Sequence, residues 1–348
     1  MTPTPTPATG PSHAGDGQTL PARLLDILVC PVCGGRISQL RLDQIRCDRC
    51  TTEYTVRGGV PRMVTSDLPD SVAETAEAFG WQWNVFTDQH REFRGEFLEW
   101  MAPIKVDDFR GKRVLDVGCG KGRHVMLAAD FGAEYVVGLD ISSAVDVAQR
   151  LTSDHPNINI VQGNLLTPPL AENAFDLIYS VGVIHHVPEP AQAVQALTKC
   201  LHPGGTLHIW VYGYEGNALV RLLVEPLRQW LARGIPRRFV RIATYPPAVV
   251  LMALAHVVRR LGPFPFLPYQ QYLRELGRFS VAHIWTIIYD QLMAPTTHYV
   301  KRQELVTWLR AAGLENIQIR NSRGMSWAGT AQRPQACGMP QSLPNRPE

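Results

Sequence analysis

Apolar stretches and amphipathic stretches alternate along the middle of the chain, between residues 113 and 212. Short apolar stretches rich in Val, Ile and Leu predict buried strands, and longer stretches with a helical period predict amphipathic helices. The predicted strands are RVLDVGC, YVVGLDI, INIVQG, FDLIYSVGV and GTLHIWVY, and the helices between them are GRHVMLAADFG, SAVDVAQRLTSD and PAQAVQALTKCL. This alternation predicts an α/β fold with a doubly wound, mostly parallel sheet.

The alternation is interrupted once and then resumes. Residues 214–298 are helical by pattern and rich in Arg and aromatic residues, which predicts a helical insert. RQELVTWLRAAGL then predicts a helix capped by Gly313, and NIQIR predicts a further strand. We therefore expect the main domain to span 111–329. Apolar residues at helical spacing over 66–110 predict a helical lid or linker ahead of it.

The two ends of the chain have compositions that do not support a packed core. Residues 1–20 and 330–348 are rich in Thr, Pro, Gly, Ser and Gln, so we expect both tails to be disordered. The first tail lacks a basic n-region and an apolar h-region, which predicts a cytoplasmic protein. Pro246, Pro247 and Arg259 bracket the most apolar stretch, so no membrane span of about 18 residues is expected.

The composition of the chain excludes few classes of function. With 348 residues, of which 45% are hydrophobic, the chain can bury a sizeable core. Its formal net charge is only +3, so the composition gives no clear nucleic-acid signal. The sequence does not indicate the oligomeric state.

Four cysteines form two C-x-x-C pairs, Cys30 with Cys33 and Cys47 with Cys50, within a small segment over 21–65. Four thiolates at this spacing suit a tetrahedral structural Zn²⁺ with no open position. The alternatives are a redox pair and a module that folds without metal. The segment resembles the small zinc-ribbon proteins that act as activator subunits of certain RNA and protein methyltransferases, which implies docking and stabilisation.

A glycine-rich turn, VLDVGCGKGRH over 114–124, follows the first strand of the main domain. Gly118, Gly120 and Gly122 would let the backbone approach a ligand closely. The G-x-G-x-G spacing differs from the one that clamps a dinucleotide pyrophosphate, and Asp116 suits an ammonium group better than a phosphate. The alternative is that the glycines only shape the turn.

Together with later blocks in the same order, this turn resembles the class I S-adenosylmethionine-dependent methyltransferases. The resemblance is to the methyltransferase type 11 group that includes ubiquinone and menaquinone C-methyltransferases, and it implies a Rossmann-like fold with S-adenosyl-L-methionine as cofactor. It also implies that Asp140 binds the ribose hydroxyls and that Asn164, where the family usually has Asp, lies near the adenine. The residues implied for cofactor binding are Asp116, Gly118, Gly120, Gly122, Asp140, Ile141, Asn164, Leu165, Ser180 and Val181.

Methyl transfer is a displacement at a sulfonium, so the protein mainly aligns the reactants and excludes water. For a hydroxyl, phenol or acidic carbon acceptor, a base would help, and His185 and His186 at the mouth of the predicted site are the nearest candidates. The alternative is that these histidines pack or cap the turn. Asp290 and His298 lie where the family carries residues that line the substrate site.

The insert combines apolar helices with arginines, and three interpretations stay open. In the first interpretation, the insert forms a lid over an apolar pocket for an aromatic, hydrophobic or lipid-like acceptor, with peripheral membrane contact. In the second, its arginines contact RNA phosphates. In the third, it is a structural subdomain with a solvated basic face. The arginines are Arg228, Arg233, Arg237, Arg238, Arg241, Arg259 and Arg260.

We therefore expect S-adenosylmethionine-dependent methyl transfer to a small-molecule acceptor. The alternatives are an RNA methyltransferase that uses the zinc ribbon for RNA docking, and a scaffold that binds the cofactor without transfer. The near-neutral charge and the lack of an Asn-Pro-Pro-Tyr type motif after the fourth strand weigh against RNA. The sequence specifies neither the acceptor nor the methylated atom.

Overall fold

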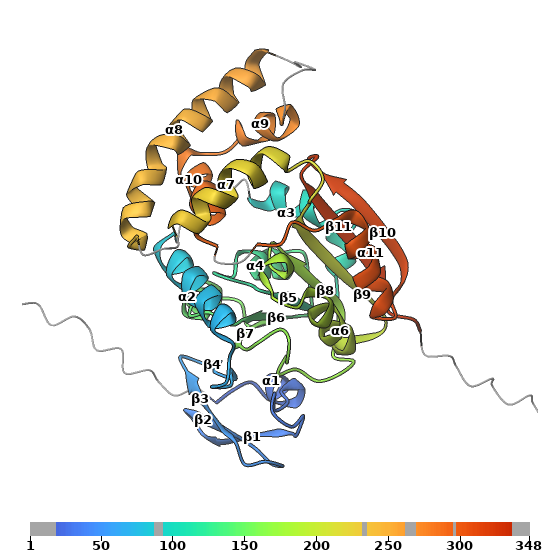
Figure 1. Ribbon diagram of the computed structural model, residues 1–348. Helices are drawn as coiled ribbons and strands as arrows, with labels where there is room; N and C mark the ends of the chain where they lie inside the picture. The colour runs from blue at the N-terminus through green and yellow to red at the C-terminus, as the bar shows by residue number, and fades with distance from the viewer. Residues whose placement is uncertain (1–18, 87–92, 232–234, 262–268, 295–296, 336–348) are drawn as a thin grey trace, which may run out of the picture.

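The computed structural model describes residues 19–86, 93–231, 235–261, 269–294 and 297–335. Its centre is a seven-stranded sheet with the order β10-β11-β9-β8-β5-β6-β7 (Figure 1). Strands β5 to β9 are parallel to one another, and β11 pairs antiparallel with β9 and β10. This arrangement confirms the predicted fold class. The strands are β5 (Arg113–Val117), β6 (Tyr135–Asp140), β7 (Ile158–Gln162), β8 (Phe175–Val181), β9 (Leu201–Tyr212), β10 (Glu315–Ser322) and β11 (Ser326–Gln332).

Helices cover both faces of this sheet, because successive strand residues point to opposite sides. Val114 and Val136 pack in one core cluster, whereas Leu115 and Val137 pack in another on the opposite face. Strands buried on both faces give continuous apolar runs, which is why the sequence pattern located them. The first cluster includes residues of α4 (Arg123–Asp130) and α5 (Val145–Thr152), and the second includes residues of α6 (Pro190–Cys200) and α11 (Arg302–Ala311).

The segment that carries the four cysteines folds as a small module at one end of the molecule (Figure 1). Its apolar residues do not form a core of their own. Leu24, Leu28 and Met63 belong to the same cluster as Leu115 and Val137 of the large sheet. The module consists of α1 (Ala22–Ile27) and an antiparallel sheet of β1 (Ile37–Arg41), β2 (Gln44–Cys47), β3 (Glu53–Arg57) and β4 (Val60–Pro61).

The module also covers the edge of the large sheet at β7. The Met63 amide donates a hydrogen bond of 2.8 Å to the carbonyl oxygen of Gln162, the last residue of β7. Beside it, the guanidinium of Arg62 forms an ion pair with Asp146 of α5. An outer strand with unpaired backbone groups is prone to aberrant pairing, and these contacts protect β7 from it.

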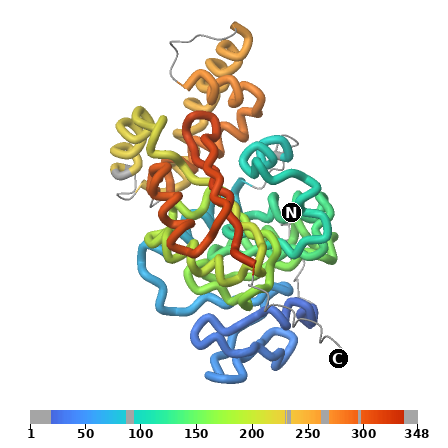
Figure 2. Tube along the Cα trace, turned by 90° about the vertical axis from the view of Figure 1, so that its right-hand side faces the viewer, coloured from blue at the N-terminus to red at the C-terminus, as the bar shows by residue number. Residues whose placement is uncertain are grey.

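The four helices that the structure describes between residues 214 and 298 lie at the opposite end of the molecule from the module (Figures 1 and 2). They have core clusters of their own, one of which contains Ala248, Ala255, Leu276 and Ile284. A second, smaller cluster joins them to Phe86 at the end of α2. The helices are α7 (Ala218–Leu231), α8 (Arg237–Leu261), α9 (Gln270–Leu276) and α10 (Val281–Met293), and α2 (Asp70–Val85) and α3 (Phe93–Met101) precede the sheet.

Helix α8 runs for 25 residues straight through Pro246 and Pro247, two of the residues that bracket the most apolar stretch. An 18-residue window in it has a mean hydropathy of 1.4, and 22% of this window is buried inside the protein. By length and composition alone the helix could cross a membrane, which is weak evidence for a span.

Each segment that was expected to be a disordered tail overlaps the folded part of the chain. Leu20 is buried in the core cluster that the module shares with the sheet, and β11 continues to Gln332, with Ala331 buried. The boundaries at 20 and 330 are therefore wrong, because the apolar residues beyond them pack. Residues 1–18 and 336–348 lie outside the described residues, as does Arg233.

Candidate functional site

A cavity of about 910 Å³ lies at the carboxyl ends of the central strands and extends under the helices α7, α8 and α10. In the sheet, β5 is flanked by β6 on one side and β8 on the other. Ligands of open α/β sheets bind where the strand order reverses in this way. The cavity lining includes the predicted cofactor residues Gly118, Gly120, Asp140, Ile141, Asn164, Leu165 and Val181, and it does not include Asp116, Gly122 and Ser180.

The glycine-rich turn after β5 forms one wall of this cavity. Gly118 and Gly120 have φ angles of 77° and 51°, which residues with a side chain rarely adopt. A Cβ at Gly118 would lie 2.3 Å from Val183 Cγ2, and one at Gly120 would lie 3.2 Å from Trp83 Nε1. The backbone conformation and the close neighbours both require glycine. Helix α2, which carries Trp83, therefore lies directly over the turn.

Asp140, at the carboxyl end of β6, is held in one orientation by three hydrogen bonds. Its Oδ2 accepts from the Gly120 amide at 2.8 Å. Its Oδ1 accepts from the amide of Ser142 at 2.8 Å and from the Ser142 hydroxyl at 2.7 Å. Burial raises the pKa of Asp140, and these hydrogen bonds act in the opposite direction. The carboxylate still lines the cavity and has lone pairs left for ligand hydroxyls.

Asp116 lies behind the cavity wall, only 1% exposed. Among the described residues, its Oδ2 has no hydrogen-bond partner. Burial, and after it the charge of Asp140, raises the pKa of Asp116 well above its usual value. A buried carboxylate oxygen without a partner is costly, so its place beside the glycine turn fits a cationic ligand group.

The two histidines after β8 differ in position. His186 lines the cavity, with Thr297 Oγ1 3.3 Å from its Nδ1. His185 is fully buried outside the lining, its ring centroid 4.2 Å from that of Tyr212, and burial lowers its pKa well below the usual value. The expectation that His185 lies at the mouth is therefore wrong, because the 3₁₀ turn over Ile184–His186 directs its ring into the core.

Asp290 and His298 were both expected to line the substrate site, and only Asp290 lines the cavity. Asp290 of α10 lines the cavity and accepts hydrogen bonds of 3.2 Å from the Tyr212 hydroxyl and from Gln82 Nε2. Burial and the neighbouring Asp290 raise the pKa of Tyr212 well above its usual value, so the phenol stays protonated. His298 is exposed and lies outside the lining.

Sequence reasoning missed a buried charged cluster at the cavity wall. Glu96 of α3 lies 3.6 Å from His283 Nε2 and 3.8 Å from Arg323 NH1, and both partners also line the cavity. Burial raises the pKa of Glu96 to about 7, despite the charges of Arg123 and Arg323. Arg123 directly follows the glycine turn and completes the cluster in the lining. The other residues of the cluster come from distant segments of the chain. The position of Arg123 in GKGRH is therefore the only sequence signal that could have indicated the cluster.

Much of the remaining cavity wall is apolar and comes from the insert. None of its residues belongs to a recognisable motif, so the sequence predicted this pocket only as a general property of the insert. The wall residues from α7, α8 and α10 include Val224, Leu227, Trp230, Phe239, Val240, Leu251 and Ile287.

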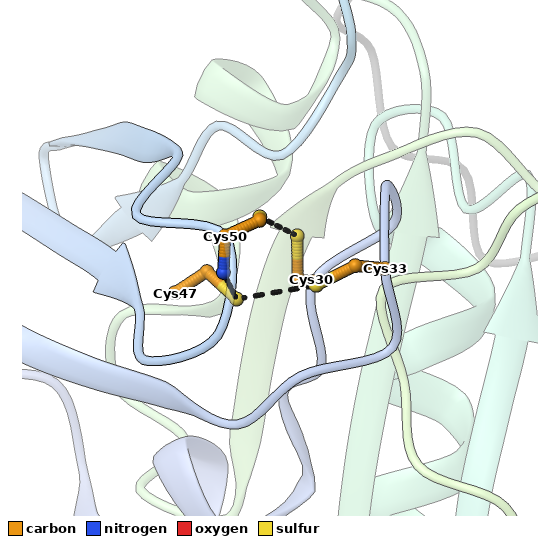
Figure 3. Close-up of side chains that lie close together, drawn as sticks. All are labelled: Cys30, Cys33, Cys47 and Cys50. Atoms are coloured by element: carbon orange, nitrogen blue, oxygen red, sulfur yellow. Dashed lines mark hydrogen bonds between the residues drawn. The ribbon is translucent and has the colours of Figure 1, made fainter.

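The four cysteines come together in the module as predicted (Figure 3). Their sulfur atoms all lie within 4.8 Å of one another. The Cys30–Cys50 and Cys33–Cys47 sulfur distances are 3.6 and 3.4 Å. Four ligands about 2.3 Å from a tetrahedral Zn²⁺ would be separated by roughly 3.8 Å, so the geometry suits that ion.

Backbone packing around the sulfur atoms supports the same donor set. A Cβ at Gly35 would lie 2.8 Å from Cys47 Sγ and 3.2 Å from Cys33 Sγ, so only glycine fits between the two. The amides of Arg49 and Cys50 approach Cys47 Sγ at 3.4 and 3.5 Å. Amides directed at a sulfur stabilise a thiolate, which is the form that binds metal.

The central segment is similar to known proteins. Residues 115–209 match the family described as "Methyltransferase domain". A tRNA U34 carboxymethyltransferase of Methylococcus capsulatus is 32% identical over 157 residues, covering 41% of this chain and 48% of the relative. A ubiquinone biosynthesis O-methyltransferase of Neisseria meningitidis serogroup C is 30% identical over 155 residues, covering 41% of this chain and 64% of the relative.

Among solved structures, an S-adenosylmethionine dependent methyltransferase from Mesorhizobium loti has 18% sequence identity and a TM-score of 0.42, covering 68% of this chain and 97% of that chain. The chain spans about half the length of the carboxymethyltransferase that it matches. Residues 115–209 are thus similar to the methyltransferase domain family, in agreement with the resemblance seen in the ordered motifs.

Proposed function

We propose that this protein transfers a methyl group from S-adenosylmethionine to a small acceptor with a polar head and an apolar body. One observation carries the proposal: a single cavity joins the glycine turn and Asp140 to charged residues and to the apolar wall from α7, α8 and α10. The charged part suits a polar reacting end, and the apolar wall suits a hydrophobic or lipid-like body.

The residues at the glycine turn fit the cofactor. Gly118 and Gly120 line the cavity beside Asp140, and the Asp140 carboxylate offers oxygens to ribose hydroxyls. When bound, the cofactor supplies a methyl group on an activated sulfonium. Trp83, packed over the turn, keeps water away from that end of the cavity.

A proton acceptor is available if the acceptor atom carries a proton. Glu96 lines the cavity with a pKa of about 7, which suits general base catalysis at neutral pH. His186 is a second candidate in the lining, and Asp290 orients the Tyr212 hydroxyl through their hydrogen bond. We assign His185 no direct role, because its ring is fully buried outside the cavity.

A second candidate function is RNA methylation. Several relatives are named tRNA U34 carboxymethyltransferase, which counts against the expectation of no nucleic-acid signal. The arginines of the insert would supply phosphate contacts in that case. We favour the small acceptor because the cavity wall from α7, α8 and α10 consists mainly of aliphatic and aromatic side chains, which give no phosphate contacts.

Calorimetric titration with S-adenosylmethionine and S-adenosylhomocysteine tests the cofactor assignment. We expect Asp140→Asn to weaken binding at least tenfold, because about 1.5–3 kcal/mol is lost with hydrogen bonds to a charged group. Asp154→Asn is the matched control, since Asp154 is exposed beyond α5. A well-folded wild type that binds neither ligand would refute the proposal.

Transfer of a labelled methyl group distinguishes the two acceptor classes. The protein is incubated with labelled cofactor and either an organic extract of cells or total tRNA, and both fractions are counted. Label in the organic fraction is the expected result. Label in the tRNA alone would replace the small acceptor with RNA.

A further inference from the structure

We propose that helices α7 and α8 form a docking surface for an anionic lipid bilayer. This surface goes beyond the cofactor site and the cavity, because it lies on the outside of the insert. Most of the large apolar side chains that the described residues expose are on these two helices. An apolar area of this kind on a folded protein marks a binding site for a protein or a membrane.

Helix α7 presents a continuous apolar stripe to solvent. Leu219, Leu223, Leu227 and Trp230 are exposed, and their spacing of three or four residues places them on one helix face, with the exposed Leu222 beside them. Leu222 and Leu223 are 70% and 68% exposed. An exposed helix face in water normally carries polar residues, so the stripe requires an apolar partner.

Helix α8 is apolar on both of its faces. Its inner face, with Ala248 and Ala255 fully buried, packs with residues of α9 and α10 in one cluster. On its outer face, Ile242 and Val250 are each 69% exposed, and Leu254 and Val257 are exposed beside them. Because protein covers the inner face, we infer that the helix lies in the plane of a membrane surface rather than across the bilayer.

The charges of the two helices indicate which kind of partner the docking surface binds. Together they carry seven arginines and one glutamate; Arg228 is buried in an ion pair with Glu225 and Arg237 pairs with Glu77, so the other five arginines supply the positive charge. In α8 the arginines lie at the two ends, and residues 242–255 between them contain no charged side chain. Terminal arginines suit anionic headgroups and the uncharged middle suits acyl chains, whereas an RNA surface would need charges along the whole helix.

The docking surface is continuous with the cavity. Leu227, Trp230 and Phe239 line the cavity and are also exposed, so α7 and α8 form the rim through which it meets solvent. Docking would place this rim against the lipid, and an amphiphilic acceptor could enter without passing through water. Only this last step rests on the proposed function, because the docking itself needs no methyl transfer.

Flotation with lipid vesicles tests the docking. The full chain is mixed with vesicles of phosphatidylcholine alone or with 30% phosphatidylglycerol, and the bound fraction is measured after centrifugation. We expect binding to the anionic vesicles and at least tenfold weaker binding by Leu222→Asp with Leu223→Asp. Leu42→Asp, at an exposed leucine in the four-cysteine module, is the matched control and should bind like wild type.

A second variant tests the role of charge. Arg238→Gln with Arg260→Gln, at two exposed arginines near the ends of α8, should weaken binding to anionic vesicles by roughly thirtyfold. Equal binding of wild type to neutral and anionic vesicles would overturn the assignment, as would absence of binding. A wild-type dimer in light scattering that the Leu222 and Leu223 changes dissociate would make the surface a self-association site instead.

Titration of the same preparations with S-adenosylhomocysteine separates the two proposals. A protein that binds the cofactor product but not vesicles refutes the docking alone. A protein that binds vesicles but not the cofactor product refutes the methyltransferase proposal alone. Normal cofactor binding by the aspartate variants also shows that they remain folded.

Discussion

The four-cysteine module and the α7–α10 insert are both additions to the same central sheet. They differ in how far their apolar side chains are buried. The module buries Leu24, Leu28 and Met63 in the core cluster of the sheet itself. The insert keeps small clusters of its own and leaves the outer faces of α7 and α8 exposed. Apolar side chains therefore stabilise the fold in one region and remain exposed on the outer helix faces in the other.

The two regions also differ in what holds them together. Four cysteine sulfurs converge in the module, and its last strand covers the edge of the sheet at β7. The insert is anchored through helix packing and through contacts such as the Asp290 carboxylate with Tyr212. A change in the module should therefore disturb the whole fold, whereas a change on the outer face of the insert should disturb only its interactions.

Removal of the metal should give the largest effect. We expect about one Zn²⁺ per chain, and Cys30→Ser with Cys47→Ser should lose it and lower the thermal midpoint strongly. Structural Zn²⁺ contributes about 10–16 kcal/mol in isolated zinc-finger peptides, and here its loss also exposes the apolar face shared with the sheet. Metal analysis and thermal unfolding, with Zn²⁺ or Mg²⁺ added back after chelation, provide the measurement. A metal-free chain of unchanged stability would contradict the prediction.

Substitution of one leucine in each region tests the difference in burial between the module and the insert. Leu24→Ala in the module should lower the free energy of unfolding by about 2–5 kcal/mol, because the side chain is fully buried. Leu223→Ala in the insert should change it by less than about 0.5 kcal/mol, because that side chain is mostly exposed. Urea unfolding measures both. Equal losses would show that the insert face is packed in solution and that the contrast between the regions is wrong.

The pH dependence of stability should show a smaller effect from Glu96. Burial raises its pKa from 4.5 to about 7, which corresponds to roughly 3 kcal/mol between fully protonated and fully ionised protein. The contribution is fully present below about pH 4.5 and is lost as the pH rises through 7. Relative to Glu96→Gln, wild type should therefore lose stability over this range.

Urea unfolding at pH 5 and pH 8 measures this difference. Glu172→Gln, at an exposed carboxyl, is the control and should follow wild type at both values. A constant difference between wild type and Glu96→Gln would mean that Glu96 ionises normally in its buried cluster.

The sequence predicted the parts of the molecule whose chemistry is local. Strand runs, the glycine turn and the cysteine pairs depend on neighbouring residues, and each lies in the structure where the pattern placed it. The charged cluster was missed because Glu96, Arg123 and Arg323 come together only through tertiary folding. The position of His185 was wrong for a related reason: a turn pattern does not specify which of two adjacent rings faces a cavity.

The hydrogen bond between Met63 and Gln162 has a consequence for how the chain is made. Its two partners are separated by nearly a hundred residues, and a ribosome adds about 5–20 residues per second. For roughly 5–20 seconds, the nascent module therefore has its cysteines in place but lacks the strand that its last residues contact. During that interval the predicted Zn²⁺ would add to the pairing of β1 to β4 in holding the module together, so the order of synthesis favours metal loading before the sheet closes.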